Sequence, residues 1–150
     1  MSSEIKNLIK IEFPSRPENI SFARTCAAAF AAQLDCTLEE IEEVKLVISE
    51  AISNSIIHGY DNQPDGVIIL EMKLLPEKKI ELMIEDYGCG IADVNQAMEP
   101  RYSSIVNRMG LGFVFMKSFT EDLQVTSEVD RGTKVRMIKT FLPISKENDL

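Results

Sequence analysis

Glu50, Asn54 and His58 are the residues of this sequence whose types and spacing most directly suggest chemistry, because they recur at intervals of four. Residues four apart lie on the same side of a helix. When residues 42–57 are projected at about 100° per residue, Glu50 and Asn54 fall among apolar side chains, outside the polar stripe expected to face solvent. Both side chains need partners there, since an unpaired buried amide costs about 1–3 kcal/mol.

Two kinds of partner remain open at this point. Neighbouring backbone could satisfy Glu50 and Asn54, or the helix could be rotated so that water does. Alternatively, both side chains face a cleft in which a cation and an anionic ligand complete their bonding. Mg²⁺ fits the second explanation, because it takes hard oxygen ligands, usually one or two protein groups together with phosphate oxygens.

Two glycine-rich segments could make close contacts to such a ligand. Asp86-Tyr87-Gly88-Cys89-Gly90 follows a predicted strand, and its glycines permit turns and close backbone approach. Gly110-Leu111-Gly112-Phe113 is predicted to open a helix, whose free N–H groups and positive dipole end could receive phosphate oxygens. Each segment alone is equally typical of an ordinary turn or helix start. Neither has the spacing of a Walker loop, a dinucleotide-binding fingerprint or a eukaryotic-type kinase loop.

Composition narrows the class of partner. The 150 residues suffice for one domain, and 45% hydrophobic with 27% charged residues is ordinary for a globular protein. The net charge of −8 argues against nucleic acid as a partner and favours a basic protein partner.

The three cysteines, Cys26, Cys36 and Cys89, lack metal-ligand spacing and are expected to be reduced thiols. No signal core or membrane-spanning run is visible, so we expect a cytoplasmic location.

The elements that must position these residues follow from periodicity and capping signals. Ser15 with Glu18, and Thr37 with Glu40, form capping-box signatures that open two helices, the second of which stops at Gly59. Residues 86–112 lack clear periodicity except for a possible helical turn at 94–98, and an irregular stretch this long is usually functional. The predicted strands are 8–13, 67–75, 79–85, 123–127 and 133–141, and the predicted helices run to about 35, from 37 to 59 and from 112 to 119.

This order predicts an α+β fold: a two-layer α/β sandwich whose helices pack on one face of a mixed, mostly antiparallel sheet. We expect a single domain with a core at about residues 8–142 and loose termini.

Taken together, the motifs resemble a known superfamily. The order Glu-x-x-x-Asn-x-x-x-His-Gly-Tyr, Asp-x-Gly-x-Gly, Gly-Leu-Gly-Phe and Gly132-Thr133 resembles the Bergerat-type ATP-binding fold of gyrase, Hsp90, histidine kinases and MutL. Within it, the small size and the stretches Ser21-Phe22-Ala23-Arg24 and Ile57-His58-Gly59-Tyr60 are most similar to the anti-sigma factor serine kinases, in particular the sporulation anti-sigma F type.

The resemblance implies a role for each matching position. Glu50 would be the general base that takes the proton of a partner serine, and Asn54 would bind the Mg²⁺ of Mg·ATP. Residues 98–109 would form the ATP lid, with Arg108 the first choice and Arg101 the second for meeting the γ-phosphate. Arg24 would contact both protein partners. The remaining implied ATP-binding residues are Asp86, Gly88, Gly90 and Thr133 around the adenine and Gly110, Leu111 and Gly112 around the phosphates.

Some residues of these motifs also have a simpler structural interpretation. Arg24 could be an ordinary solvated helix residue. Ser103 and Ser104 are expected to be polar lid residues rather than phosphorylation sites, and His58 is expected to be structural rather than a phosphoacceptor.

The implied function is that of a partner-switching regulator of sporulation transcription. A homodimer with ATP bound would sequester a sigma factor, and it would phosphorylate a serine of the anti-anti-sigma factor. The alternatives are a stress-response anti-sigma B type kinase and a non-catalytic module that only sequesters its partner. A histidine kinase catalytic domain is a weaker rival, because no phosphoacceptor helix precedes the fold and the chain contains one His.

Overall fold

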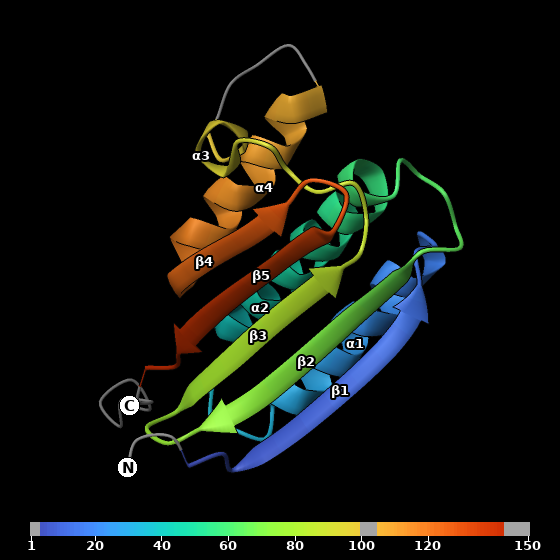
Figure 1. The fold of residues 1–150 in the computed structure, drawn as a ribbon. Coiled ribbons are helices and arrows are strands. Elements are labelled where there is room, and N and C mark those ends of the chain that lie inside the picture. The colour runs from blue at the N-terminus through green and yellow to red at the C-terminus, as the bar shows by residue number, and fades with distance from the viewer. Residues whose placement is uncertain (1–3, 100–104, 143–150) are drawn as a thin grey trace.

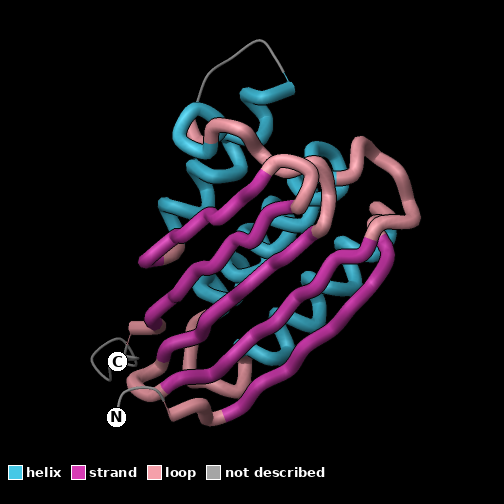
Figure 2. The backbone as a smooth tube through the Cα atoms, viewed as in Figure 1, coloured by secondary structure: helices cyan, strands magenta, loops and turns pink. Residues whose placement is uncertain are grey.

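The sheet of this protein has five strands in the order β1-β2-β3-β5-β4, and helices lie along one of its faces (Figures 1 and 2). The computed structural model describes residues 4–99 and 105–142, with the backbone alone for residues 105–109. Each described strand pair is antiparallel. The predicted two-layer α+β sandwich is therefore confirmed, and its sheet is antiparallel throughout the described residues rather than mixed.

The strands are β1 (Asn7–Pro14), β2 (Val67–Leu75), β3 (Lys79–Asp86), β4 (Glu121–Glu128) and β5 (Gly132–Thr140). The helices are α1 (Glu18–Ala31), α2 (Leu38–Asn54), α3 (Val94–Ala97) and α4 (Ile105–Phe119), with a π-helical turn, η1 (Ser55–Gly59), continuing α2. Within the described ranges, none of these helices combines the length and apolar character needed to cross a membrane.

The core lies between the sheet and the helices because the strands alternate in character. In β3, Ile80, Leu82 and Ile84 are almost fully buried on the helix-covered face. Glu81 faces the other side, where Arg136 pairs with it at 2.7 Å and Lys73 at 3.6 Å. One apolar and one charged face is the pattern expected of an antiparallel sheet covered on one side only.

Capping explains where α2 starts but not where α1 starts. The Thr37 side chain accepts from the Glu40 N–H and the Glu40 side chain accepts from the Thr37 N–H, so this predicted capping box is confirmed. The box predicted at Ser15 is wrong. Helix α1 begins at Glu18 without a side-chain cap, and Ser15 instead donates to the Gln63 carbonyl and accepts from the Gly66 N–H.

The helix predicted at 112–119 is also longer than its sequence signals suggest. Helix α4 begins at Ile105, so Gly110 and Gly112 lie inside it rather than at its start. Residues 105–112, which were expected to be irregular, are therefore helical. The helical turn predicted at 94–98 is present as α3.

Gly132 is a position where the fold requires glycine. Its φ is +116°, and an added Cβ would lie 2.0 Å from the Asp86 backbone oxygen. Replacing Gly132 by Ala is therefore expected to lower the free energy of unfolding by about 2–4 kcal/mol, measured by urea denaturation. Lys134→Ala, at an exposed position of the same strand, is the matched control and should change it by less than about 0.5 kcal/mol. Equal stability of the two variants would contradict this reading.

Candidate functional site

Helix α2 brings Glu50 and Asn54 to the side facing α4, at the end where η1 begins. A Cβ added at Gly112 of α4 would lie 3.0 Å from Glu50 Oε1 and 3.3 Å from Asn54 Nδ2, so both side chains lie directly under this helix. Both residues are half-buried. The inward placement expected from the helical projection is therefore what the structure has.

The π turn η1 changes the register of the residues that follow Asn54. A π turn contains one residue more than an α turn, and such turns occur often at functional sites. In this geometry Ser55 is buried and its hydroxyl bonds to the Asp86 carboxylate. Gly59 lies against the same carboxylate, with an added Cβ only 3.1 Å from it.

Asp86 is a buried carboxylate at the end of β3, opposite Thr133 of β5. Burial raises the pKa of Asp86, and this effect outweighs the hydrogen bonds from the Gly88 N–H, the Ser55 hydroxyl and the Thr133 N–H. The Gly88 bond is 2.9 Å long. A carboxylate held in this way offers its remaining lone pairs to a hydrogen-bond donor in the adjacent pocket.

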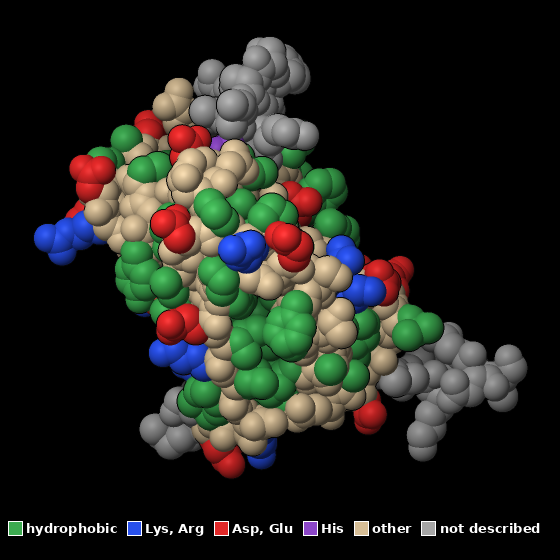
Figure 3. Space-filling view, turned by 90° about the vertical axis from the view of Figure 1, so that its right-hand side faces the viewer, with side chains coloured by type: hydrophobic (Ala, Val, Ile, Leu, Met, Phe, Trp, Pro, Cys, Tyr) green, Lys and Arg blue, Asp and Glu red, His purple; other side chains and the backbone are tan. Residues whose placement is uncertain are grey.

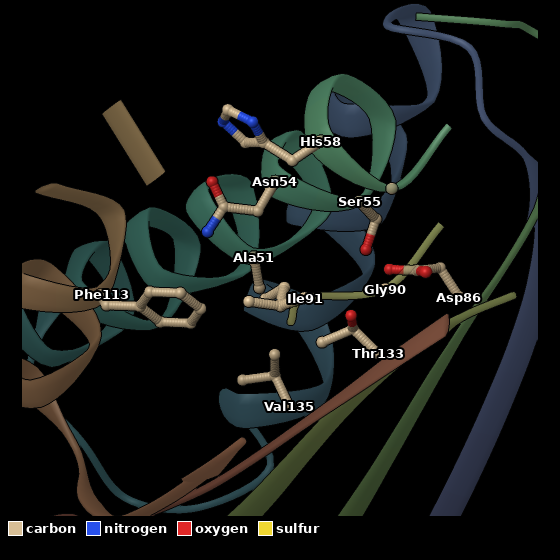
Figure 4. Close-up of a pocket in the computed structure, with 11 residues that line it drawn as sticks. Ala51, Asn54, Ser55, His58, Asp86, Gly90, Ile91, Phe113, Thr133 and Val135 are labelled. Atoms are coloured by element: carbon tan, nitrogen blue, oxygen red, sulfur yellow. The ribbon is translucent and has the colours of Figure 1, made fainter. Parts of the chain in front are cut away.

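One pocket brings four of the predicted residues together (Figure 4). Asn54 from α2, Asp86 from β3, Gly90 from the following loop and Thr133 from β5 line it. Its other walls include the apolar side chains of Ile91, Phe113 and Val135. The cavity volume is about 20 Å³, roughly the space of one water molecule. A larger ligand must therefore displace part of the wall, and Phe113 on α4 points toward the pocket from one side.

Glu50 lies in a groove next to this pocket rather than in it. The groove is lined by Glu50, Ser53, Asn54, Ile57, His58, Leu111 and Phe115, so Asn54 and His58 border both spaces. Burial raises the pKa of Glu50. Leu111 and Phe115 are 50% and 40% exposed, which gives the groove an apolar rim beside a carboxylate.

The Gly110-Leu111-Gly112 segment is placed differently from the prediction. An α-helix leaves free only the N–H groups of its first turn, and α4 has five residues before Gly110. The glycines instead allow close packing: a Cβ at Gly110 would lie 2.2 Å from the Glu99 carbonyl oxygen, and Gly112 lies on Glu50 and Asn54. For these amides to hold phosphates, the start of α4 would have to open.

The other predicted site residues lie outside the pocket or outside the described part of the chain. Gly88 does not line the pocket but donates to Asp86. Arg24 lies half-buried on α1 and borders neither the pocket nor the groove. Arg101, Ser103 and Ser104, and the side chain of Arg108, fall outside the described residues.

Several residues of the site carried no clear signal in the sequence. Ser55 and Gly59 lie within the quoted Glu-to-Tyr motif, yet only their contacts with Asp86 reveal a part in the site. Ile91 follows the first glycine-rich segment and Phe113 ends the second, but no role in the site was predicted for either. Their proximity to the pocket depends on how the loop and α4 fold over the sheet.

The donor set suits Mg²⁺ with a phosphate ligand. Among the described residues, Asn54 Nδ2 is one of few buried side-chain atoms without a hydrogen-bond partner. A phosphate oxygen could accept from this amide nitrogen while the amide oxygen binds a cation. The described residues contain no cluster of three or more His, Cys, Asp or Glu that could hold a metal alone. Asn54 would be one protein ligand of Mg²⁺, and phosphate and water would complete its shell.

Known proteins are similar to this chain in sequence and in fold. A family model described as the histidine kinase-like ATPase domain matches residues 13–139. In structure, the chain is similar to the histidine kinase domain of the blue-light activated histidine kinase from Erythrobacter litoralis EL346. The TM-score is 0.57 with 17% identity, over 85% of this chain and 61% of that one, so this likeness concerns the fold alone.

The similar sequences cover nearly the whole chain. The chain is 47% identical over 141 residues to the anti-sigma F factor of Clostridium beijerinckii, covering 93% of this chain and 98% of that protein. It is 40% identical over 137 residues to the anti-sigma F factor of Geobacillus thermodenitrificans, covering 90% and 93%. Residues 13–139 therefore form a histidine kinase-like ATPase domain, and the chain belongs to the anti-sigma F factor family.

Proposed function

We propose that this protein binds and inhibits a sigma F type sigma factor, and that it uses Mg·ATP to phosphorylate a serine of the anti-anti-sigma factor. One observation supports the proposal most strongly. The Glu50 carboxylate and the Asn54 amide lie side by side under Gly112, and Asn54 also lines the pocket that contains Asp86.

This arrangement supports the following chemistry. Asp86 would accept a hydrogen bond from the adenine amino group, and Asn54 would hold the Mg²⁺, which would neutralise phosphate charge. Glu50 takes the proton of the attacking serine hydroxyl, and burial favours this role because it raises the pKa of Glu50 and so makes the carboxylate a stronger base. Phosphoryl transfer depends chiefly on positioning and on stabilising charge, which these groups supply.

The serine would reach Glu50 through the groove between α2 and α4. Its exposed rim, formed by Leu111 and Phe115, suits an apolar residue beside the phosphorylated serine. The nucleotide would lie on the other side of Asn54 and His58, which border both spaces.

Phe115→Ala tests this route directly. Losing the apolar rim should raise KM for the protein substrate about tenfold, as expected for a truncated contact residue, while the Kd for ATP stays unchanged. Steady-state phosphorylation and calorimetry measure the two quantities. Lys117→Ala, at an exposed position of the same helix, is the control and should change neither. A weaker ATP affinity with unchanged KM would instead assign the groove to the nucleotide.

Protein partners are proposed from family membership and surface character. The net charge of −8 suits the basic surface of a DNA-binding sigma factor, and Arg24 on α1 is the proposed contact to both partners. A homodimer would have apolar surface to bury on the β1 side, where hydrophobic side chains gather (Figure 3). Leu8 and Ile9 of β1 and Phe22 of α1 are exposed, at 45%, 37% and 60%.

The deciding experiment mixes the purified chain with Mg·ATP and the anti-anti-sigma factor of the same organism. The expected result is one phosphoserine in that protein, found by mass spectrometry, and ATP-dependent co-purification of a sporulation sigma factor. No transfer would refute the kinase activity, and no sigma binding would refute the anti-sigma role. Binding of a stress-response sigma factor instead would favour the anti-sigma B alternative.

A further inference from the structure

The hydroxyl of Ser127 on β4 connects two residues that line the pocket, Ile91 and Thr133, with the Gly132 carbonyl at the start of β5. Its Oγ accepts a hydrogen bond of 2.7 Å from the Ile91 N–H, in the loop after the glycine segment. The same Oγ lies 3.0 Å from the Gly132 carbonyl oxygen and 2.8 Å from Thr133 Oγ1. Ser127, Thr133 and Asp86 are neighbours in register across β4, β5 and β3.

The direction of these bonds follows from the available protons. A serine hydroxyl has one proton to donate and two lone pairs to accept with. The Ile91 N–H can only donate and the Gly132 carbonyl can only accept, so Ser127 must give its proton to Gly132 if that bond is made. All three contacts are then hydrogen bonds only if the Thr133 hydroxyl donates to Ser127.

On the side that faces the pocket, the hydroxyl oxygen of Thr133 can then only accept hydrogen bonds. Its proton is committed to Ser127, while its N–H already donates to Asp86. The Asp86 carboxylate accepts hydrogen bonds only, when ionised. This end of the pocket therefore offers two acceptors to a ligand and no hydroxyl donor from Thr133.

We infer that Ser127 is a positioning residue that makes the pocket select a purine with an amino group at C6 over one with a carbonyl there. The inference rests on the proposed function, and Ser127 acts through Thr133 rather than by touching the base. An amino group donates to acceptors, whereas a carbonyl oxygen would face the lone pairs of Thr133. Without Ser127, the Thr133 hydroxyl could rotate and donate to that carbonyl.

The test compares binding of ATP and of inosine triphosphate, whose base has a carbonyl at C6, to the full chain with Mg²⁺. The selectivity ratio is the Kd for inosine triphosphate divided by the Kd for ATP. This ratio should fall about tenfold in Ser127→Ala, the effect of roughly one hydrogen bond. Ser127→Thr keeps the hydroxyl and should restore the ratio. Both nucleotides are measured on the same sample, so partial unfolding cancels from the ratio.

A double-mutant cycle separates positioning from general support of the fold. Thr133→Val should lower the ratio by itself, and adding Ser127→Ala to it should change the ratio no further. Thr126→Ala, at an exposed position next to Ser127 on β4, is the matched control and should leave the ratio unchanged. If wild type binds ATP but Ser127→Ala keeps its ratio, this inference alone is overturned. If wild type binds neither nucleotide, the proposed function fails, and the inference fails with it.

Discussion

Replacing Glu50 by Gln is expected to slow phosphate transfer to the partner serine by about 10²- to 10⁴-fold, the usual contribution of a general base. Gln has the same shape but cannot take a proton at neutral pH. Because Glu50 lines the groove and not the adenine pocket, the Kd for ATP should stay within about threefold of wild type. Single-turnover phosphorylation at saturating ATP and calorimetry give the two values. An unchanged transfer rate would show that Glu50 is not the base.

The pH dependence provides a second signature of Glu50. Burial raises its pKa, so the folded protein holds this proton more tightly than the unfolded chain does. Stability from this group is therefore fully present below the unfolded pKa, about 4.3, and is lost as pH rises through the raised folded pKa. Transfer should show the opposite trend, because the base must be ionised, and its rate should fall as pH drops through the raised pKa.

Glu50→Gln should consequently be more stable than wild type at pH 7, and this advantage should vanish near pH 4. Urea denaturation at both values measures it, with Glu42→Gln as the control at an exposed position of the same helix. Equal destabilisation of Glu50→Gln at both values would indicate a structural carboxylate instead. A gain in stability with a loss of activity is the usual sign of a group held for function.

Local signals predicted those parts of the fold whose partners are near in sequence. The strands predicted at 67–75 and 79–85 are present as β2 and β3 with almost the same bounds, because only the short stretch Pro76-Glu77-Lys78 separates them and they pair with each other. The capping box at Thr37 joins two residues that are only three apart in the sequence, Thr37 and Glu40. Ser15 carries the same signature, but its partners Gln63 and Gly66 are 48 and 51 residues away, so no local pattern could reveal them.

The start of α4 shows a tertiary contact overriding local propensity. Glycine has a low helix propensity, so Gly110 and Gly112 were expected to mark the start of the helix rather than to lie inside it. In the structure Gly110 lies where an added Cβ would collide with the Glu99 backbone, and Gly112 lies where an added Cβ would be in tight contact with the Glu50 and Asn54 side chains. The order of motifs sufficed to predict that Asn54, Asp86 and Thr133 meet. The contacts of Phe113 and Ser127 depend on how α4 and β4 pack, which the order of motifs does not contain.

Replacing Asp86 by Asn is expected to weaken ATP binding about 10- to 100-fold, corresponding to 1–3 kcal/mol for a buried group left without its partner. The carboxylate uses its lone pairs to accept from Gly88, Ser55 and Thr133, and in the proposed complex it also accepts from the adenine amino group. An Asn has one acceptor oxygen and an NH₂ group that would face one of these donors. The loss should be measured by calorimetry as a change in Kd.

Unfolding should not account for that loss. Two effects on stability oppose each other: burial raises the pKa of Asp86, so an uncharged Asn removes the cost of the buried charge at neutral pH, whereas its NH₂ group faces one of the donors that the carboxylate accepted from. The thermal midpoint of Asp86→Asn at pH 7 should therefore stay close to that of wild type. Glu85→Gln changes the adjacent carboxylate, which points to the opposite face of β3, and should leave the Kd for ATP unchanged. If Asp86→Asn binds ATP as tightly as Glu85→Gln does, the adenine amino group is not recognised by Asp86, and the nucleotide must lie elsewhere on the domain.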